Sequence, residues 1–284
     1  MIHRSTLLRS AAGLAAALLS ASCGTRPAPI PEAQTPLPPG LRGSVVYQRA
    51  DGIYRTELGS TQSVRIAEGG SWPRWSPDGR RVAFVKGPRI VVVGADGQGA
   101  AVVARPAKPR AVAWHPDGRH VLFTDDDVIR SVDLETRETR TVISGWVFRE
   151  LDISRDSARL VATVRRGGPQ MRGFDLARGT DWRIAGGCSA SLSPDEEQVT
   201  NNDGDHRALS IRQWKNGRKV GAVHAPPGRT FDNQYWSNHP DWIASITDDN
   251  SQDVFIHQIS QDRAFRVTSC GDADRPDLHL ENAD

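Results

Sequence analysis

A short stretch recurs along this chain at a nearly constant spacing, and the repeat limits the possible folds more than any other feature. Its best copy is residues 71–85, SWPRWSPDGRRVAFV. Trp75 precedes a Ser-Pro-Asp-Gly turn, and an apolar run follows the turn. Proline, aspartate and glycine favour the backbone angles of tight turns, so the stretch predicts a β-hairpin with one buried face.

The apolar residue before each turn serves as an anchor from which the repeat is counted. The first four anchors, each 39 residues after the last, are Trp75, Trp114, Ile153 and Leu192. Trp236 follows after 44 residues and Leu278 after a further 42. Each period has room for four short strands, and four antiparallel strands per ~40 residues is typical of one blade of a β-propeller. We therefore predict an all-β fold.

The two ends of the repeat suggest how the ring closes. Residues 44–67 supply three strands without an anchored first strand, and residues 275–280 supply such a strand and then stop. We predict six blades, the first completed by the C-terminal strand. The other five blades are expected at approximately 71–104, 110–144, 149–185, 188–223 and 233–268. A seventh blade or a loosely formed fifth blade are the alternatives, because residues 198–202 (QVTNN) are unusually polar for a strand.

The amino terminus has the features of an export signal. Residues 1–23 begin with basic side chains, continue with a short apolar core and end in Ser-Ala-Ser-Cys. This ending resembles a bacterial lipobox, which implies lipidation of Cys23, although Ser20 stands where that motif usually has leucine. Ordinary cleavage after Ser22 is the alternative, and it would leave Cys23 as a free thiol. We expect an exported protein, lipid-anchored to a bacterial membrane and facing the periplasm or the cell exterior.

A proline-rich segment, residues 24–40, separates this signal from the repeats. It holds six prolines and no apolar periodicity, which predicts an extended tether rather than a core-forming element. The propeller is then expected over residues 41–284.

The repeat also resembles a known family. Residues 71–85 are similar to the WD-like repeat of the TolB C-terminal propeller, with its Ser-Pro-Asp-Gly centre and trailing Val-Ala-Phe. The resemblance is strong in the second and third blades and weaker in the fourth and fifth. It implies a six-bladed propeller in the bacterial envelope. TolB proteins carry an α/β domain where this chain has the tether and lipid site, so we expect a TolB-like lipoprotein rather than TolB itself.

Few sequence features point to chemistry. The 36 basic and 34 acidic residues nearly balance, which argues against a nucleic-acid partner. The sequence lacks G-x-S-x-G, H-E-x-x-H, paired-cysteine and phosphate-loop patterns, so we predict no enzyme activity, no cofactor and no metal. His115 and His239 lie in turns and are interpreted as solvated. Four acidic loops suggest an acidic top face and leave calcium as an alternative: 125–127, 203–205, 248–250 and 271–274.

The candidate binding residues come mainly from the innermost strands, which line a propeller's channel. Strand alternation places residues one and three before each anchor on the channel side. This rule selects Trp72, Arg74, Glu150, Asp152, Ser189, Ser191, Asn233, Tyr235, Arg275 and Asp277. They are either hydrogen-bonded and ion-paired links between blades or a mixed-charge pocket for a small polar ligand or peptide end.

Two loops add candidates. Trp146 and Phe148 lie in an apolar run that is either covered core or an exposed partner-binding patch. Residues 224–232 form a long loop of the kind that often carries function. The predicted binding set is Trp72, Arg74, Trp146, Phe148, Glu150, Asp152, Asn233, Tyr235, Arg275 and Asp277. Cys188 and Cys270 are expected near the channel mouth, as separate thiols or, alternatively, as a disulfide.

These features predict a monomeric, non-enzymatic envelope lipoprotein. Its propeller would bind an envelope protein, peptide or glycan through the top face and the channel mouth. One alternative is an enzyme that acts on envelope polysaccharide with the channel carboxylates Glu150 and Asp152. Another is a ligand sensor for a membrane partner.

Overall fold

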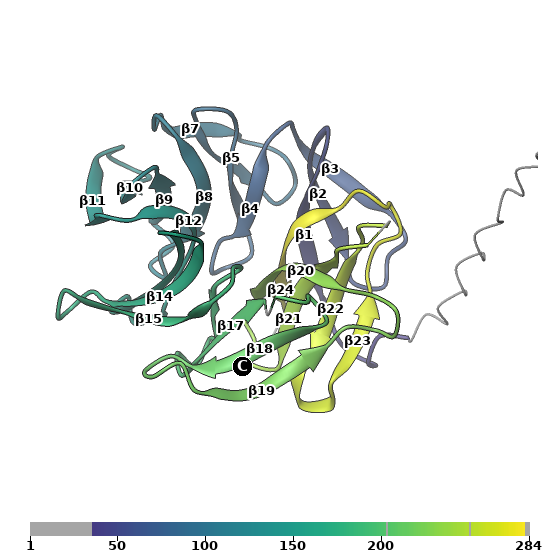
Figure 1. Cartoon of the computed structure of the whole chain (residues 1–284). Coiled ribbons are helices and arrows are strands. Elements are labelled where there is room, and N and C mark those ends of the chain that lie inside the picture. Colours follow the sequence, from purple (N-terminus) through teal and green to yellow (C-terminus); the bar gives the residue numbers. More distant parts are fainter. Residues whose placement is uncertain (1–35, 203, 250, 282–284) are drawn as a thin grey trace, which may run out of the picture. The chain divides into compact units, whose positions relative to one another are not determined.

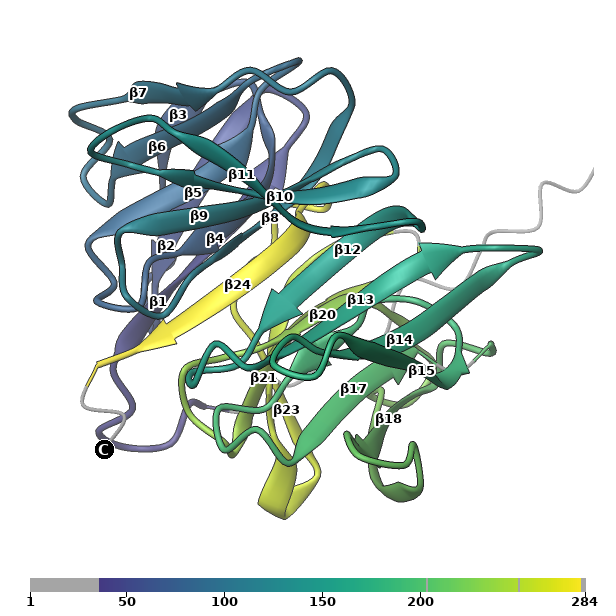
Figure 2. The ribbon, with the colours of Figure 1, turned by 90° about the vertical axis from the view of Figure 1, so that its left-hand side faces the viewer.

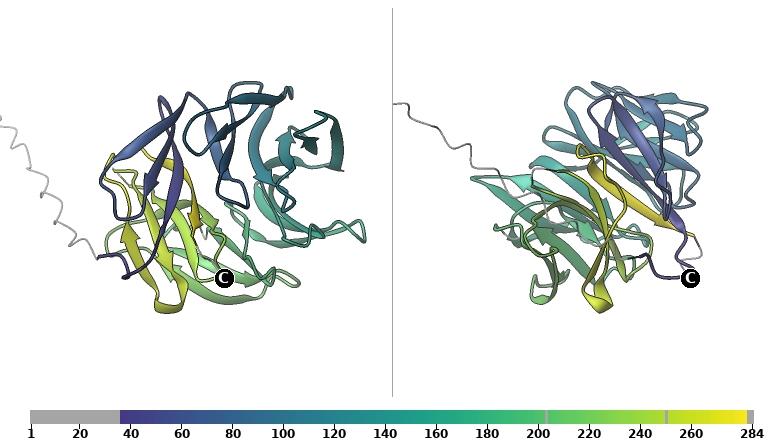
Figure 3. Two further views of the ribbon diagram at one scale, coloured as in Figure 1. Left: turned by 180° about the vertical axis from the view of Figure 1, so that it is seen from behind. Right: turned by 90° about the vertical axis from the view of Figure 1, so that its right-hand side faces the viewer.

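The computed structural model describes residues 36–281 apart from residues 203 and 250. Six four-stranded antiparallel sheets follow one another around a ring in chain order (Figure 1). The view from behind shows the same succession of sheets (Figure 3). This confirms the predicted all-β, six-bladed propeller. Within the described part of the chain, no helix is long and apolar enough to cross a membrane.

The strands of the first three blades have the following bounds. Blade 1 contains β24 (Asp274–Leu280), β1 (Gly43–Arg49), β2 (Gly52–Glu57) and β3 (Ser63–Glu68). Blade 2 contains β4 (Ser71–Trp75), β5 (Arg81–Val85), β6 (Ile90–Gly94) and β7 (Ala101–Ala104). Blade 3 contains β8 (Pro109–Trp114), β9 (His120–Asp125), β10 (Val128–Asp133) and β11 (Thr139–Ser144).

The other three blades repeat the pattern. Blade 4 contains β12 (Val147–Ile153), β13 (Arg159–Arg165), β14 (Pro169–Asp175) and β15 (Thr180–Gly186). Blade 5 contains β16 (Ser191–Leu192), β17 (Gln198–Asn202), β18 (Ala208–Gln213) and β19 (Lys219–His224). Blade 6 contains β20 (Phe231–Trp236), β21 (Trp242–Thr247), β22 (Val254–Gln258), the 3-10 turn η1 (Ile259–Gln261) and β23 (Arg263–Arg266).

The ring closes as predicted, through the C-terminal strand. β24 pairs antiparallel with β1 from Gly43 opposite Leu280 to Gln48 opposite Asp274. In Figure 2 the yellow β24 ends beside the start of β1. Strands near the two ends of the described chain thus form one sheet, and the pairing covers an edge that would otherwise be exposed.

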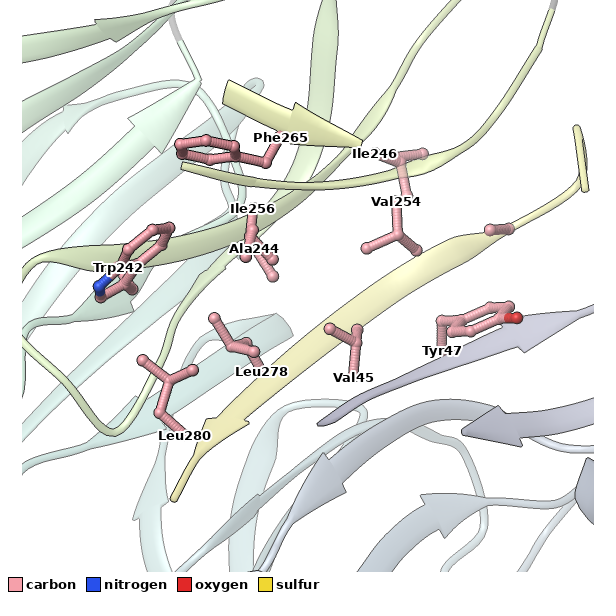
Figure 4. Packing of buried hydrophobic residues seen from close by; sticks show 11 residues of the cluster. Val45, Tyr47, Trp242, Ala244, Ile246, Val254, Ile256, Phe265, Leu278 and Leu280 are labelled. Carbon is pink, nitrogen blue, oxygen red and sulfur yellow. The ribbon is translucent and has the colours of Figure 1, made fainter. Parts of the chain in front are cut away.

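Apolar side chains fill the spaces between neighbouring blades. One buried cluster lies at each of the six blade-to-blade contacts within the described residues. At the closure, Val45 and Leu278 of blade 1 pack with Trp242 and Ile256 of blade 6 (Figure 4). Because each blade buries both faces against its neighbours, the ring is held by packing between sheets as well as by hydrogen bonds within them.

The repeated turn has a repeated hydrogen-bond pattern. Ser76 Oγ donates to Asp78 Oδ1 at 2.6 Å and accepts from the backbone N–H of Arg81 at 2.9 Å. Ser154 and Asp156 make the same contact in blade 4 at 2.5 Å. These bonds explain why serine and aspartate recur in the repeat.

The polar fifth blade forms in full. Val199 and the polar residues around it in β17 are buried, and Asn201 Oδ1 accepts from Arg212 Nε at 2.9 Å. Asn202 Nδ2 donates to Asp232 Oδ1 of blade 6 at 2.7 Å. Asn201 and Asn202 are therefore accommodated by hydrogen bonds to a neighbouring strand and to the next blade, whereas Thr200 Oγ1 and Asn202 Oδ1 are buried without a hydrogen-bond partner among the described residues.

Candidate functional site

A cavity on the channel axis lies where the innermost strands begin, and we call it the upper mouth. Its volume is about 580 Å³. Most of its lining residues stand three or four positions before an anchor. The lining consists of Ser71, Trp72, Pro109, Arg110, Arg149, Glu150, Thr163, Pro169, Cys188, Asp232, Asn233 and Arg275. Four predicted binding residues, Trp72, Glu150, Asn233 and Arg275, are therefore brought together here.

Three of these side chains sit on unusual backbone. Trp72, Asn233 and Arg275 have φ values of 57°, 52° and 52°, in the left-handed region that non-glycine residues rarely occupy. Each is the third residue before its anchor, and the strand register shifts at all three. Bulges of this kind redirect side chains, and strained backbone recurs at binding sites.

A chain of contacts links the blades across the upper mouth. Arg275 Nη1 lies 3.1 Å from Glu150 Oε1, and its guanidinium carbon lies 3.7 Å from the centre of the Trp72 ring. Glu150 also accepts hydrogen bonds from the Thr163 hydroxyl and the Ser189 backbone N–H. Both oxygens of the Glu150 carboxylate are thus engaged, and the ion pair keeps Arg275 over the Trp72 ring.

Two arginines at the upper mouth were missed by the sequence rule. Arg110 and Arg149 stand four residues before their anchors, in blades 3 and 4. Neither guanidinium has a hydrogen-bond or ion-pair partner among the described residues. The equal offset from the anchors was a usable signal, because the same offset gives Asp232 in blade 6.

Blade 6 contributes an acidic residue, Asp232, to the upper mouth, and the negative charge of this residue is disfavoured. Burial raises the pKa of Asp232, against the hydrogen bond from the Asn233 backbone N–H and the charge of Arg275. Asn202 Nδ2 also donates to its Oδ1 at 2.7 Å. Three arginines therefore face one fully paired glutamate and one aspartate whose charge is disfavoured. The upper mouth is suited to a negatively charged group.

The remaining channel residues line a second cavity near the Ser-Pro-Asp-Gly turns, which we call the lower mouth. It holds about 170 Å³ and shares no lining residue with the upper mouth. Arg74, Asp152, Tyr235 and Asp277 lie here. The ten predicted binding residues therefore do not form one site.

The side chains one residue before the anchors connect successive blades. Asp277 Oδ2 accepts the backbone N–H of Trp75, the anchor of the next blade, at 2.7 Å. Asp152 Oδ2 does the same for Leu192 at 2.8 Å. The Ser191 hydroxyl accepts the N–H of the Trp236 anchor at 2.8 Å. At these positions the interpretation as links between blades is the one that the geometry supports.

The lower mouth has unusual electrostatics because its charged groups are buried. The Arg74 guanidinium carbon lies 3.7 Å above the centre of the Tyr235 ring. Burial raises the pKa of Asp277 to about 7, although the charge of Arg74 opposes the shift. Burial also raises the pKa of Asp152, against hydrogen bonds from Leu192, Tyr235 and Ser191.

The two loop candidates have different environments. Phe148 is fully buried in the cluster between blades 3 and 4, so its side chain is core and not a partner-binding surface. Trp146 is partly buried, with the guanidinium carbon of Arg172 4.1 Å from its ring centre. In the long loop after β19, Arg229 pairs with Asp249 at 3.0 Å.

In three of the four acidic loops an aspartate is paired with a basic side chain, which lowers the acidity expected of the top face. Lys108 lies 2.8 Å from Asp126, and Arg49 lies 2.7 Å from Asp272. Asp249 is paired in the same way, with Arg229. The sequence count missed these pairs because their basic partners come from other strands and loops.

Both described cysteines are free thiols, which confirms the prediction of separate thiols and not the alternative of a disulfide. Cys188 lines the upper mouth, whereas Cys270 packs against the core cluster between blades 6 and 1. Burial and the negative charge of Glu150 raise the pKa of Cys188 to about 11. Cys188 is therefore a weak nucleophile at neutral pH. Cys23 lies outside the described residues.

Comparisons with known proteins agree on the architecture. No family model matches the chain, and no curated protein matches its sequence. Among solved structures, TolB from Acinetobacter baumannii superposes with a TM-score of 0.69 at 18% identity, over 83% of this chain and 66% of that one. The fold is that of a TolB-like propeller. The chain spans just under two thirds of the TolB chain.

Two further structures show how widely this propeller is used. A chain of a nidogen/laminin complex matches with a TM-score of 0.69 and 12% identity, over 85% of this chain and 99% of that one. An oligogalacturonate lyase in complex with manganese matches with a TM-score of 0.53 and 14% identity, over 80% and 72%. The fold is thus shared by a protein solved in a protein complex and by an enzyme, and it does not by itself decide the function.

Proposed function

We propose that this chain is an exported lipoprotein, anchored to a bacterial membrane through Cys23, whose propeller binds a protein or peptide partner at the upper mouth. The partner would place a carboxylate, from an acidic side chain or a chain terminus, between Arg110 and Arg149. The observation that carries the proposal is that Arg110 and Arg149, at the edge of a cavity of about 580 Å³, have no hydrogen-bond or ion-pair partner in the described part of the chain.

The surroundings of the two arginines support this assignment. Arginine binds carboxylates through paired hydrogen bonds in a fixed fork. Arg275 cannot compete for the same group, because Glu150 and Trp72 already hold it. Trp72 adds an aromatic face of the type enriched at binding hot spots. A likeness to a propeller solved in a nidogen/laminin complex fits a role in protein binding.

The enzymatic alternative has weaker support in the channel geometry. Asp152 receives hydrogen bonds from the Ser191 hydroxyl and from the backbone N–H groups of Ile153 and Leu192. Glu150 is bound to Arg275, Thr163 and Ser189. Carboxylates engaged in this way are poorly placed to transfer protons to a substrate. The likeness to a lyase keeps the alternative worth testing.

The test is affinity capture from detergent-solubilised membranes with three baits. These are the unmodified chain, Arg149→Gln, and Arg218→Gln as a control, since Arg218 is exposed on the turn between β18 and β19. We expect a stoichiometric protein retained by the first and third baits and lost from the second. Equal capture by all three would contradict the role of the upper mouth.

A parallel assay addresses the alternatives. The chain is incubated with cell-wall and envelope polysaccharide fractions, with Asp152→Asn as the comparison. Turnover that Asp152→Asn abolishes while the fold stays intact would replace the binding proposal with an enzymatic one. Saturable polysaccharide binding without a captured protein would make the partner a glycan and overturn the proposal of a protein or peptide.

A further inference from the structure

A cluster of two histidines and one aspartate lies on blade 3, at the turn between β8 and β9. His115, Asp117 and His120 each offer a ligand atom, and the three atoms lie within 4.8 Å of one another. The turn belongs to the same end of the innermost strands as the lower mouth, which includes Pro116. The cluster therefore lies apart from the upper mouth and does not depend on the proposed partner.

Both imidazole rings direct the same kind of atom at one carboxylate oxygen. Asp117 Oδ2 lies 3.0 Å from His115 Nδ1 and 2.7 Å from His120 Nδ1. His115 Nδ1 also lies 3.3 Å from the backbone nitrogen of Asp117. Two imidazole nitrogens and one carboxylate oxygen, all atoms that can bind a metal ion, therefore converge on one point.

The second ring nitrogen of His120, Nε2, lies near a carboxylate, as the non-coordinating nitrogen of a metal-binding histidine usually does. His120 Nε2 lies 3.5 Å from Asp133 Oδ2. Asp133 is itself held by Arg119, whose Nε and Nη2 donate at 2.9 and 2.6 Å. Metal-binding histidines almost always direct their second nitrogen to such a carboxylate, which leaves the first nitrogen unprotonated for the metal. Asp133 would be a positioning residue here.

We propose that His115 Nδ1, Asp117 Oδ2 and His120 Nδ1 form a zinc site with one open coordination position. Two imidazoles and a carboxylate are ligands that Zn²⁺ prefers, and three protein ligands plus water is a common arrangement. Zinc bonds of about 2.1 Å place tetrahedral ligand atoms about 3.4 Å apart, so Asp117 Oδ2 needs to move away from each of the two Nδ1 atoms by less than about 1 Å. A hollow of about 430 Å³ lined by Asp117, His120 and Asp133 gives solvent access to the site.

The chain contains its own control for this site. Blade 6 has a matching His-Pro-Asp turn, in which His239 Nδ1 accepts the backbone N–H of Asp241 at 3.1 Å. Trp242 follows Asp241, and no second histidine completes the set within this turn. The turn alone therefore explains one histidine in blade 3 but not the second.

The experiment is a calorimetric titration of the full chain with ZnCl₂, without a histidine tag, after removal of metals with a chelator. We expect one Zn²⁺ per chain. His115→Gln and His120→Gln should each weaken binding by at least about tenfold, and His239→Gln should leave it unchanged. Two ligand variants are used so that a folding defect in one does not decide the outcome.

A second measurement identifies the donor atoms. X-ray absorption of the zinc-loaded chain should show nitrogen and oxygen ligands and no sulfur, which separates this site from any binding by cysteines. Thermal unfolding of the unmodified chain should shift upward with zinc, and that of His120→Gln should not. The proposal is overturned by the absence of one-to-one binding, by sulfur in the zinc ligand set, or by unchanged affinity in both ligand variants.

Discussion

At the scale of single residues, the side chains one position before the anchors bind the backbone of the next blade. Asp277 is the clearest case, because its carboxylate accepts the N–H of Trp75 and is fully buried beside Arg74 and Asp152. Its folded-state pKa of about 7 lies above its ordinary value of 3.8. The folded chain therefore binds this proton more tightly than the unfolded chain does.

This difference predicts a specific pH dependence. The stability that Asp277 contributes is complete below about pH 4, declines as the pH rises toward about 7, and is constant above that. Asp277→Asn keeps an oxygen to accept from Trp75 and cannot ionise. The unfolding free energy of the unmodified chain minus that of the variant should fall across this window, by at most about 4 kcal/mol. Urea unfolding at several pH values measures it, and a difference that stays flat or rises would contradict the assignment.

Sequence alternation found some of the upper-mouth residues and missed others for a physical reason. It assigned positions one and three before each anchor to the channel, which holds for Glu150 and Arg275. Arg110 and Arg149 lie next to register shifts in β8 and β12. A bulge interrupts the two-residue period, so strict alternation fails at the start of these strands. That neither arginine has a partner among residues 36–281, leaving out 203 and 250, depends on side chains from other blades, which no local pattern contains.

At the scale of elements, β24 decides whether the ring closes. Leu278 is 1% exposed and packs between β1 and blade 6 (Figure 4). The closure could be predicted from the sequence, because the N-terminal repeat lacks an anchored strand and the C-terminal segment supplies one. The formation of β17 was harder to predict, since its Asn201 and Asn202 bond to Arg212 and Asp232, which the local sequence pattern does not contain.

Leu278→Ala tests the contribution of this strand. Removing a buried leucine side chain should lower the unfolding free energy by about 2–5 kcal/mol, because it leaves a cavity at the closure. Val64→Ala is the matched control, since Val64 on β3 is 62% exposed and should change stability little. Chemical denaturation of both variants gives the comparison. Equal small effects would mean that β24 adds little to the closure.

At the scale of the whole molecule, the fold could be predicted from the period of the repeat. Attachment to a membrane through a lipid on Cys23 remains a prediction. If Cys23 is lipidated, the chain should incorporate labelled fatty acid and sediment with membranes. Cys23→Ala should lose the label and move to the soluble fraction. A protein that is exported without label would instead fit ordinary cleavage after Ser22.

The central claim is that the upper mouth binds an acidic group of the partner through Arg110 and Arg149. The most direct measurement is the affinity of the captured partner for the unmodified chain, for Arg110→Gln/Arg149→Gln and for Arg218→Gln. A charge-assisted hydrogen bond contributes about 1.5–3 kcal/mol, so the double variant should bind at least about tenfold more weakly, with a smaller dependence on salt. Arg218→Gln should bind as the unmodified chain does. Equal affinity of the double variant and the unmodified chain would contradict the claim.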